Sequence, residues 1–232
     1  MLGCQDRPIV IPKLPALTRA LTSNWVPIRS LAPRHRERIL AHLEALPPGD
    51  RYLRFGYAAS DEQLSRYVAS IDFERDEVFG IFNRHLSLIA MAHLAYGAET
   101  QRPCQPAMVE FGVSVAREAR GRGYGKQLFR HAMLHARNRD IDTLYICALS
   151  ENAAMLHIAR SLGAKVEREG SDSEAWLKLP PASLGSQLDE FIDSHAAELN
   201  YSMKRQVQHI GEFFDVVAEV KDRMSPGSAA SE

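Results

Sequence analysis

Glycine and arginine alternate in the segment from position 120 to position 125, which reads Arg-Gly-Arg-Gly-Tyr-Gly. Glycine lets the backbone adopt positive φ angles and approach a ligand closely, and arginine side chains add charge-assisted hydrogen bonds to an anion. The segment lies between an apolar strand-like run at 108–115 and an amphipathic helix-like run at 126–138. A strand, a glycine-rich turn and a helix together present backbone amides to a phosphate at the helix N-terminus. The segment therefore predicts a site for a ligand that carries a pyrophosphate.

Two other phosphate-binding patterns do not fit these residues. A P-loop needs Ser or Thr directly after the lysine, but Gln127 follows Lys126. A dinucleotide-binding fingerprint needs a further glycine at a set spacing after Gly125 and an early βαβ unit, and neither is present. A protein that uses this segment to bind ATP or NAD is therefore the least favoured of the functions that the segment allows.

Overall composition limits the classes of partner. The 232-residue chain has a net charge of −1, with 45% apolar and 25% charged residues, as is ordinary for a globular protein. This balance gives no reason to expect nucleic acid or an anionic membrane as a partner. No apolar run approaches the roughly 20 residues that a membrane span needs, and the N-terminus has no secretory signal pattern.

Cysteine usage points to a reducing compartment. The three cysteines, Cys4, Cys104 and Cys147, are odd in number and have no paired spacing, which predicts reduced thiols and a cytoplasmic location. Cys147 lies in a strand-like run, where we expect it to fill the core rather than to act as a nucleophile.

The periodicity of apolar residues predicts an alternation of strands and helices in one central unit. A first strand is expected at 25–31, followed by a helix that Pro33 opens and residues 47–49 end. Ser60 is expected to cap a second helix. The remaining expected strands are 77–82, 86–96, 108–115, 143–149, 165–169 and 174–179, and the remaining expected helices are 126–138 and 152–162.

Segments outside this unit have a different character. Residues 1–24 are expected to be a loose leader, residues 25–180 one domain, and residues 225–232 a disordered tail. Residues 181–224 repeat apolar side chains at helical spacing and predict one or two amphipathic helices. Such an extension can pack on its own domain, form a homodimer or cover the acceptor site.

The order of elements and the glycine-rich segment resemble the GNAT superfamily of N-acetyltransferases. Its signature, Gln/Arg-x-x-Gly-x-Gly/Ala, is matched by Arg120, Gly123 and Gly125, and the stretch 149–152 (Leu-Ser-Glu-Asn) adds to the match. The runs at 110–115 and 51–55 are similar to those of bacterial protein-lysine acetyltransferases. The resemblance implies an α/β fold with a mixed, splayed central sheet flanked by helices, to which this chain would add a helical C-terminal extension.

The resemblance also implies acetyl-CoA as acyl donor, with no metal. Backbone amides of residues 121–126 would hold the pyrophosphate, and Val113 and Val115 would bond the pantetheine arm like an added strand. Asn152, which also suits a helix N-cap, would contact or help to position the pantetheine. The cofactor-binding residues implied in this way are Val113, Ser114, Val115, Arg120, Gly121, Arg122, Gly123, Tyr124, Gly125, Lys126 and Asn152.

The implied reaction is direct transfer of the acetyl group to a primary amine. Glu110 would be the general base, as in the lysine-acetyltransferase-like pattern. Strand alternation leaves a second interpretation open, because Val109, Phe111 and the valines after them share one face, so that Glu110 could simply point to solvent. A backbone N–H near Val113 would polarise the thioester.

The protonation of the leaving thiolate is not settled by the sequence. Many relatives use a tyrosine on the helix after Asn152, but here Ala159 occupies that position, so Ser150 or water would have to serve. The missing tyrosine motivates a second hypothesis, that of a catalytically silent acyl-CoA-binding or sensing module. The acceptor would be an amine on a small molecule or on a protein lysine.

Three further sets of residues are less specific indicators of function. His131 and His135 could share a metal, but no third ligand is apparent, which favours a solvated helix flank. We also expect a solvated helix face for the basic cluster at positions 34–38, which comprises Arg34, His35, Arg36 and Arg38. Arg51 and Arg54 could attract an acidic group of a substrate, and structural salt bridges are an equal alternative.

Overall fold

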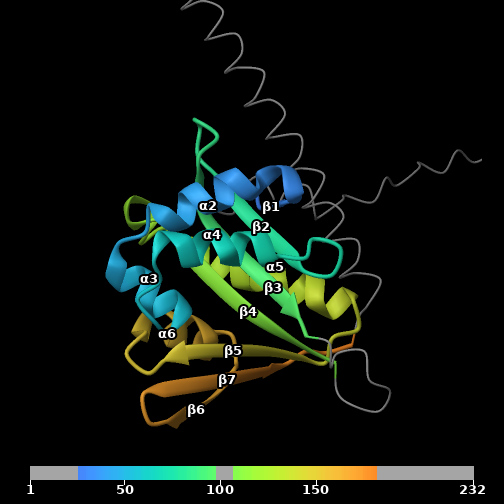
Figure 1. Ribbon diagram of the computed structural model, residues 1–232. Coiled ribbons are helices and arrows are strands. Elements are labelled where there is room, and N and C mark those ends of the chain that lie inside the picture. The colour runs from blue at the N-terminus through green and yellow to red at the C-terminus, as the bar shows by residue number, and fades with distance from the viewer. Residues whose placement is uncertain (1–25, 98–106, 182–232) are drawn as a thin grey trace, which may run out of the picture.

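A computed structural model describes residues 26–97 and 107–181 (Figure 1). Within these residues one seven-stranded mixed sheet has the order β1-β2-β3-β4-β5-β7-β6. The strands are β1 (Arg29–Ser30), β2 (Glu77–Phe82), β3 (Leu88–Tyr96), β4 (Met108–Val115), β5 (Thr143–Leu149), β6 (Lys165–Glu169) and β7 (Asp172–Lys178). The helices are η1 (Pro33–His35), α2 (Arg36–Glu44), α3 (Pro48–Phe55), α4 (Asp61–Ser70), η3 (Arg117–Ala119), α5 (Tyr124–Asn138) and α6 (Ala153–Ser161).

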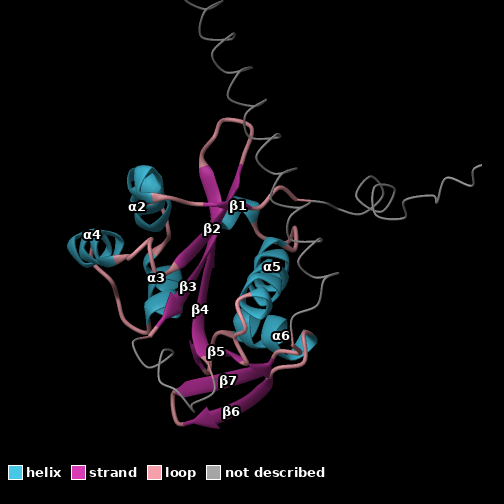
Figure 2. Cartoon of the chain, turned by 90° about the vertical axis from the view of Figure 1, so that its right-hand side faces the viewer, coloured by secondary structure: helices cyan, strands magenta, loops and turns pink. Residues whose placement is uncertain are grey.

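Helices cover both faces of the sheet, and each face has its own apolar core. Figure 2 shows α2, α3 and α4 on one side of the sheet and α5 and α6 on the other. The larger core lies under α5 and α6, where Phe111 of β4 meets Phe129 of α5 with ring centroids 4.8 Å apart. The smaller core lies under α2 and α4 and is centred on buried Ile39, Leu43 and Leu64. β4 is therefore enclosed from both sides.

The sheet opens between β4 and β5. These two strands are parallel, and their pairing covers only Met108↔Thr143, Val109↔Leu144 and Glu110↔Tyr145. On its other side β4 pairs with β3 along its whole length, from Tyr96↔Val109 to Ala90↔Val115. The edge of β4 that faces β5 consequently has no strand beside it after Glu110. The splayed sheet expected from the resemblance is confirmed.

Most expected elements are present, with one omission. The strands at 77–82, 108–115, 143–149 and 165–169 have the expected bounds, and Ser60 caps α4 by accepting a hydrogen bond from the amide of Gln63. The first strand is only two residues long. The helix that Pro33 opens ends at Glu44, before residues 47–49 as expected, but Pro48 begins a further helix, α3, that was not predicted. Proline is favoured in the first turn of a helix, where its missing N–H costs nothing.

Several expectations lie outside the described residues. They concern the leader at 1–24, the helical extension at 181–224, the tail at 225–232, and Cys4 and Cys104. Among the residues that are described, no helix is both long and apolar enough to cross a membrane. The same residues contain no group of three or more His, Cys, Asp or Glu side chains that could hold a metal ion.

Candidate active site

A cavity of about 280 Å³ lies where β4 and β5 diverge. It is bounded by α3, by one side chain of α4, and by strands β3, β4 and β5. Its lining residues are Leu53, Arg54, Phe55, Gly56, Tyr67, His93, Ala95, Glu110, Gly112, Cys147, Ala148 and Leu149. The cavity thus combines a gap in the sheet with five side chains that can exchange protons or donate hydrogen bonds, Glu110, Tyr67, His93, Arg54 and Cys147.

Glu110 lines this cavity, although its side chain is also exposed to solvent. It pairs across the strands with Ala95, and Gly112 pairs with His93, so Glu110 and His93 share one face of the sheet. Val109 and Phe111 alternate onto the opposite face and are buried. The alternation expected from the sequence is present, and helices α2 to α4 lie on the side of the sheet that carries Glu110 (Figure 2). A carboxylate in this position can reach a group bound in the gap.

Gly112 makes room for a cation next to Glu110. A methyl group added at Gly112 would overlap the guanidinium of Arg54. That guanidinium also lies 5.1 Å from the ring centroid of Phe55 and donates a hydrogen bond from Nη2 to the hydroxyl of Tyr67 at 3.3 Å. Arg51, by contrast, forms an ion pair with Asp61 at 2.6 Å and does not line the cavity. Of the two arginines considered from the sequence, only Arg54 belongs to the site.

The glycine-rich loop runs from the end of η3 into α5. Gly121 and Gly123 have φ angles of +74° and +76°, which other residues adopt only with strain. The amide of Gln127 donates to the carbonyl of Gly123 at 3.0 Å. The first turn of α5 contains the amides of Tyr124, Gly125 and Lys126. Amides in the first turn of a helix have no acceptor within the helix. The local geometry suits an anion.

Arg120 has a structural partner at the start of this loop. Its Nη2 lies 2.6 Å from a carboxylate oxygen of Asp50, and its Nε donates to the carbonyl of Val115 at 3.3 Å. The side chain therefore links the loop to α3 and to the end of β4.

Other residues of the loop have separate surroundings. Arg122 and Tyr124 line a second cavity, of about 860 Å³, which shares no lining residue with the cavity at Glu110. Lys126 is half-buried in the first turn of α5. A methyl group at Gly125 would lie 3.1 Å from a methyl carbon of Ile158, so this glycine lets α5 approach α6.

The other implied cofactor residues lie on β4 and at the start of α6. Val113 and Val115 are half-buried on the edge of β4 that faces the gap. Asn152 caps α6 by accepting a hydrogen bond from the amide of Met155, and its Nδ2 donates to the carbonyl of Leu53 at 3.2 Å. That second bond joins the start of α6 to α3, the helix whose residues Leu53, Arg54 and Phe55 line the cavity.

Ser114 turns its side chain away from the gap. It is 7% exposed, and its hydroxyl lies 2.9 Å from Nε2 of His42 on α2. Since Nδ1 of His42 lies 3.0 Å from the carbonyl of Leu88, which can only accept, Nδ1 carries the proton and Nε2 accepts from Ser114. Burial lowers the pKa of His42 to about 4. The neutral imidazole therefore fastens β4 to α2.

Comparison with known proteins decides the family. A family model described as the acetyltransferase (GNAT) family matches residues 34–164, which is more than half of the chain. The chain belongs to the GNAT family. It is an acyl-CoA-dependent N-acyltransferase, the class of enzyme to which the family belongs. A comparison with curated protein sequences found no match.

Solved structures agree on the fold of this GNAT enzyme. The GNAT domain of S. lividans PAT is 23% identical with a TM-score of 0.55, and the match covers 66% of this chain and 89% of that one. An acetyltransferase described as putative from Acinetobacter baylyi ADP1 is 18% identical with a TM-score of 0.54, over 68% and 95% of the two chains. A protein described as a putative phosphinothricin N-acetyltransferase is 15% identical with a TM-score of 0.53, over 68% and 100%.

Ala159 and Ser150, the two positions considered for protonation of the thiolate, do not line the cavity of this GNAT domain. Ala159 is fully buried in the core under α5 and α6 and does not line the cavity. Ser150 lies at the end of β5, where its hydroxyl is 2.8 Å from that of Ser173, and it does not line the cavity either.

Some expectations for side chains of the GNAT domain were wrong. Cys147 is exposed and lines the cavity instead of filling the core, because β5 turns this side chain into the gap left by β4. His131 and His135 are not a solvated flank. Their rings pack edge-on against Phe79, at centroid distances of 4.6 and 5.1 Å, and His135 lies 3.4 Å from Glu77.

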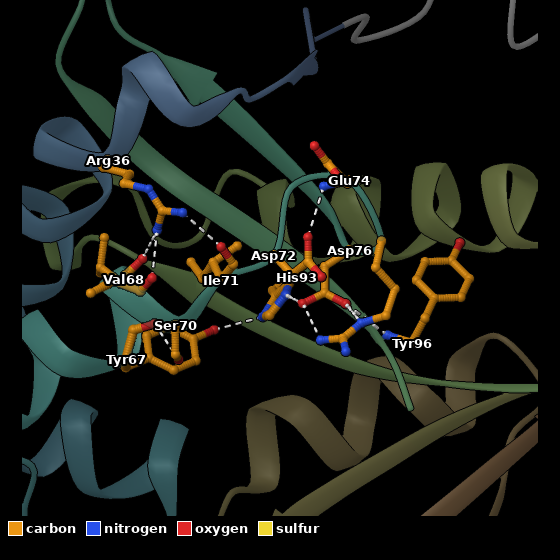
Figure 3. Close-up of polar contacts among 12 residues, drawn as sticks. Arg36, Tyr67, Val68, Ser70, Ile71, Asp72, Glu74, Asp76, His93 and Tyr96 are labelled. Carbon is orange, nitrogen blue, oxygen red and sulfur yellow. Dashed lines mark hydrogen bonds and ion pairs between the residues drawn. The ribbon is translucent and has the colours of Figure 1, made fainter. Parts of the chain in front are cut away.

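The basic cluster at 34–38 is only partly a solvated face. Arg34 and Arg38 are exposed as expected, whereas Arg36 is half-buried and His35 is buried. Arg36 donates to the carbonyls of Val68 and Ile71 and so closes the end of α4, whose last carbonyls lack helical partners (Figure 3). His35 is 4% exposed, and its Nδ1 accepts from the amide of Ala32 at 2.9 Å. These side chains stabilise the helical layer over the GNAT sheet.

Three polar residues at or behind the cavity were not predicted from the sequence. Tyr67 on α4, His93 on β3 and Asp76 before β2 form a chain of contacts that reaches the cavity (Figure 3). One signal was available. His93 interrupts an otherwise apolar strand, Leu-Ile-Ala-Met-Ala-His-Leu-Ala-Tyr, and a buried polar side chain in such a strand needs a partner.

Proposed function

We propose that the protein transfers an acetyl group from acetyl-CoA directly to a primary amine, with Glu110 as the general base. The observation that carries the proposal is the location of Glu110 in the cavity between the diverging strands β4 and β5. A thioester that enters this gap meets a carboxylate on one side and the uncovered edge of β4 on the other.

The binding of acetyl-CoA is supported by the loop and by the edge of β4. The amides at the start of α5 and the two left-handed glycines suit the pyrophosphate. The pantetheine arm, which carries amide groups, can run along Val113 and Val115 in the place of the missing strand. A backbone N–H near Val113 is then in position to polarise the thioester carbonyl.

The base is needed because the acceptor is charged in water. An alkylamine with a pKa near 10.4 reaches its neutral form at pH 7.5 at a cost of about 4 kcal/mol. A positioned base typically contributes about 10²–10⁴-fold to the rate. Glu110 accepts a proton from the attacking nitrogen as the C–N bond forms. The C–S bond then breaks and the thiolate takes up a proton, which yields CoA.

The acceptor is a primary amine on a small molecule or on a protein lysine. The cavity gives one constraint, since the acceptor must fit among Arg54, Phe55 and Tyr67 from the helical layer. The positive charge of Arg54 would repel the ammonium form of the acceptor. It therefore favours an acceptor that also carries a group, such as a carboxylate, that the guanidinium can bind.

The direct experiment measures CoA thiol release from acetyl-CoA with a panel of primary amines, namely a lysine peptide, a polyamine, amino acids and an aminoglycoside. Amine-dependent release together with a mass increase of the amine by one acetyl group is the expected result. Thermal unfolding with saturating acetyl-CoA, ATP or NAD runs in parallel, and we expect a shift of roughly 5–10 °C with acetyl-CoA alone. Binding without release by any amine would support a silent acyl-CoA-binding module instead.

A further inference from the structure

We propose that Tyr67, His93 and Asp76 form a proton relay that takes the first proton from the ammonium group of the acceptor and leaves Glu110 available for the second. This proposal rests on the proposed function, since it assigns a route for protons in the same cavity. It adds a second set of proton-transferring residues, from α4, β3 and the segment before β2, to the carboxylate on β4.

The contacts of the relay form a continuous chain. The hydroxyl of Tyr67 lies 2.8 Å from Nδ1 of His93, and Nε2 of His93 lies 3.3 Å from a carboxylate oxygen of Asp76. Figure 3 shows the three side chains pointing toward one another in this order. Tyr67 and His93 both line the cavity that contains Glu110, whereas Asp76 lies behind them and does not. The cavity end of the chain is therefore the tyrosine hydroxyl.

The partners fix the tautomer of His93. The Asp76 carboxylate can only accept a hydrogen bond, so Nε2 of His93 carries the proton. Nδ1 is then an acceptor, and the hydroxyl of Tyr67 donates to it. The oxygen of Tyr67 in turn accepts from Nη2 of Arg54 at 3.3 Å and retains a lone pair for a group in the cavity. The chain is thus oriented to move a proton from the cavity toward His93.

Asp76 is held as an anion at the far end. Its carboxylate accepts hydrogen bonds from Nε of Arg75 at 2.9 Å and from the amide of Tyr96 at 3.2 Å, while its side chain is only 4% exposed. Burial opposes ionisation, but the bonds from Arg75 and Tyr96 outweigh it and lower the pKa of Asp76. A carboxylate directly behind His93 stabilises the imidazolium that forms when the ring takes up a proton.

The groups that face the relay keep its resting state neutral. Burial, followed by the charge of Arg54, lowers the pKa of His93 against the opposing effect of Asp76. Burial raises the pKa of Tyr67, with Arg54 opposing it and Glu110 and Asp76 adding to it. At neutral pH the chain therefore consists of a hydroxyl, an uncharged imidazole and a carboxylate. The lowered pKa makes His93 a weaker base than a free imidazole, so a proton that it takes up is released again readily.

The proton balance of the reaction uses both routes. An ammonium N–H bond breaks and an O–H bond forms on Tyr67 while the original hydroxyl proton moves to Nδ1 of His93. The neutral amine attacks the thioester, and its second proton passes to Glu110 as the C–N bond forms. The C–S bond breaks, and the CoA thiolate takes the proton from Glu110. After product release the proton on His93 returns through Tyr67 to water, so the overall reaction yields amide, CoA and one proton.

The test compares pH profiles of kcat/KM for the most reactive amine of the panel in wild type and in Tyr67→Phe. The variant keeps the ring contact with Phe55, at 5.2 Å between centroids, and loses only the hydroxyl. It can use only amine that is already neutral, so its kcat/KM should rise about tenfold per pH unit toward the amine pKa near 10.4. We expect a deficit of about 10²-fold at pH 7.5 that shrinks to about twofold at pH 9.5.

His93→Asn separates proton uptake from positioning. An asparagine amide oxygen can still accept the bond from Tyr67 but cannot take up a proton, so the relay predicts the same pH-dependent deficit. Tyr57→Phe, which removes an exposed hydroxyl outside the cavity, should leave the profile unchanged. A deficit that is constant from pH 7 to pH 9.5 in both relay variants would mean that these residues only hold the cavity in shape, and it would overturn the proposal.

A measurement on the resting protein does not depend on turnover. Nitrogen-15 NMR of histidine, with the His93 signals assigned by their loss in His93→Asn, should show the tautomer with the proton on Nε2 at pH 7.5. A proton on Nδ1 would overturn the relay whether or not an acceptor has been found. The relay and the role of Glu110 can be tested separately. Normal turnover in Glu110→Gln would rule out Glu110 as the base, whereas a pH-dependent loss in Tyr67→Phe would still support the relay.

Discussion

Arg120 and Asp50 form an ion pair of 2.6 Å that joins the start of the glycine-rich loop to α3. The same helix contributes Arg54 and Phe55 to the cavity at Glu110. Arg120 also donates to the carbonyl of Val115, the last residue of β4. Arg120, the first residue of the GNAT signature, therefore fixes the loop to α3 and to β4. We expect it to influence a bound pyrophosphate by holding the loop in position.

Asp50→Asn should weaken the binding of acetyl-CoA by about fivefold, because the loss of about 1 kcal/mol of ion-pair energy loosens the loop. Isothermal titration calorimetry at low and high salt measures the change. Asp61→Asn is the matched control, since it removes an ion pair of the same length with Arg51 that does not touch the loop. Unchanged affinity in Asp50→Asn would remove this bracing role from Arg120.

Gly123→Ala should destabilise the fold by about 1–2 kcal/mol, because the residue holds a φ angle of +76° at the N-cap of α5. Nothing lies within 4 Å of the added methyl group, so the cost comes from the backbone alone. Urea unfolding measures it. Gly49→Ala, which also meets nothing within 4 Å and has no positive φ, should show no loss. Equal stability of the two variants would contradict the left-handed geometry.

Gly112→Ala should lower kcat/KM by about tenfold with little loss of thermal stability. The new methyl group displaces the guanidinium of Arg54, which is the far end of a flexible side chain, and so removes its bond to Tyr67. Steady-state kinetics and thermal unfolding separate the two effects. If Gly112→Ala acts through Arg54, then combining it with Arg54→Gln should cause no further loss. Additive losses in the double variant would contradict this mechanism.

Acid should destabilise the protein through His42. Burial lowers its pKa in the folded state to about 4 from an ordinary value of 6.5, so the unfolded chain binds the proton first. The contribution of neutral His42 to the free energy of unfolding is fully present above pH 6.5 and is lost as the pH falls toward 4. At pH 4.5 this loss is on the order of 3 kcal/mol.

Urea unfolding at pH 7.5 and pH 4.5 should therefore show a smaller pH dependence in His42→Gln than in wild type. His157→Gln, on the exposed side of α6, should keep the wild-type dependence. His35 contributes in the same direction, because burial, with Arg29 and nearby arginines, lowers its pKa to about 4 as well. A His42→Gln protein with the full wild-type dependence would show that His42 titrates normally.

Periodicity predicted the sheet well and the helical layer less well. The bounds of β4 and β5 follow from apolar runs that are flanked by turn residues, which a single sequence displays directly. The helix α3 was missed because proline and glycine at 47–49 favour both the end of one helix and the start of the next. That omission mattered for the site, since α3 supplies its arginine.

The site was predictable only where its residues are close in sequence. The loop at 120–126 and the strand with Glu110 are local patterns, whereas Tyr67, Asp76 and His93 come from three segments and meet only in the folded chain. Cys147 shows the same limit. Its strand has the composition of a buried strand, and its exposure results from the divergence of β4 and β5, which strand propensity does not encode.

The most direct test of the central claim compares Glu110→Gln with wild type in both acetyl-CoA binding and turnover. The side chains have nearly the same size, so the account predicts an unchanged Kd for acetyl-CoA and a kcat/KM for the amine that is lower by about 10²–10⁴-fold. Glu62→Gln, on the exposed face of α4, should match wild type in both. Turnover in Glu110→Gln equal to that of wild type would contradict the role of Glu110 as the general base.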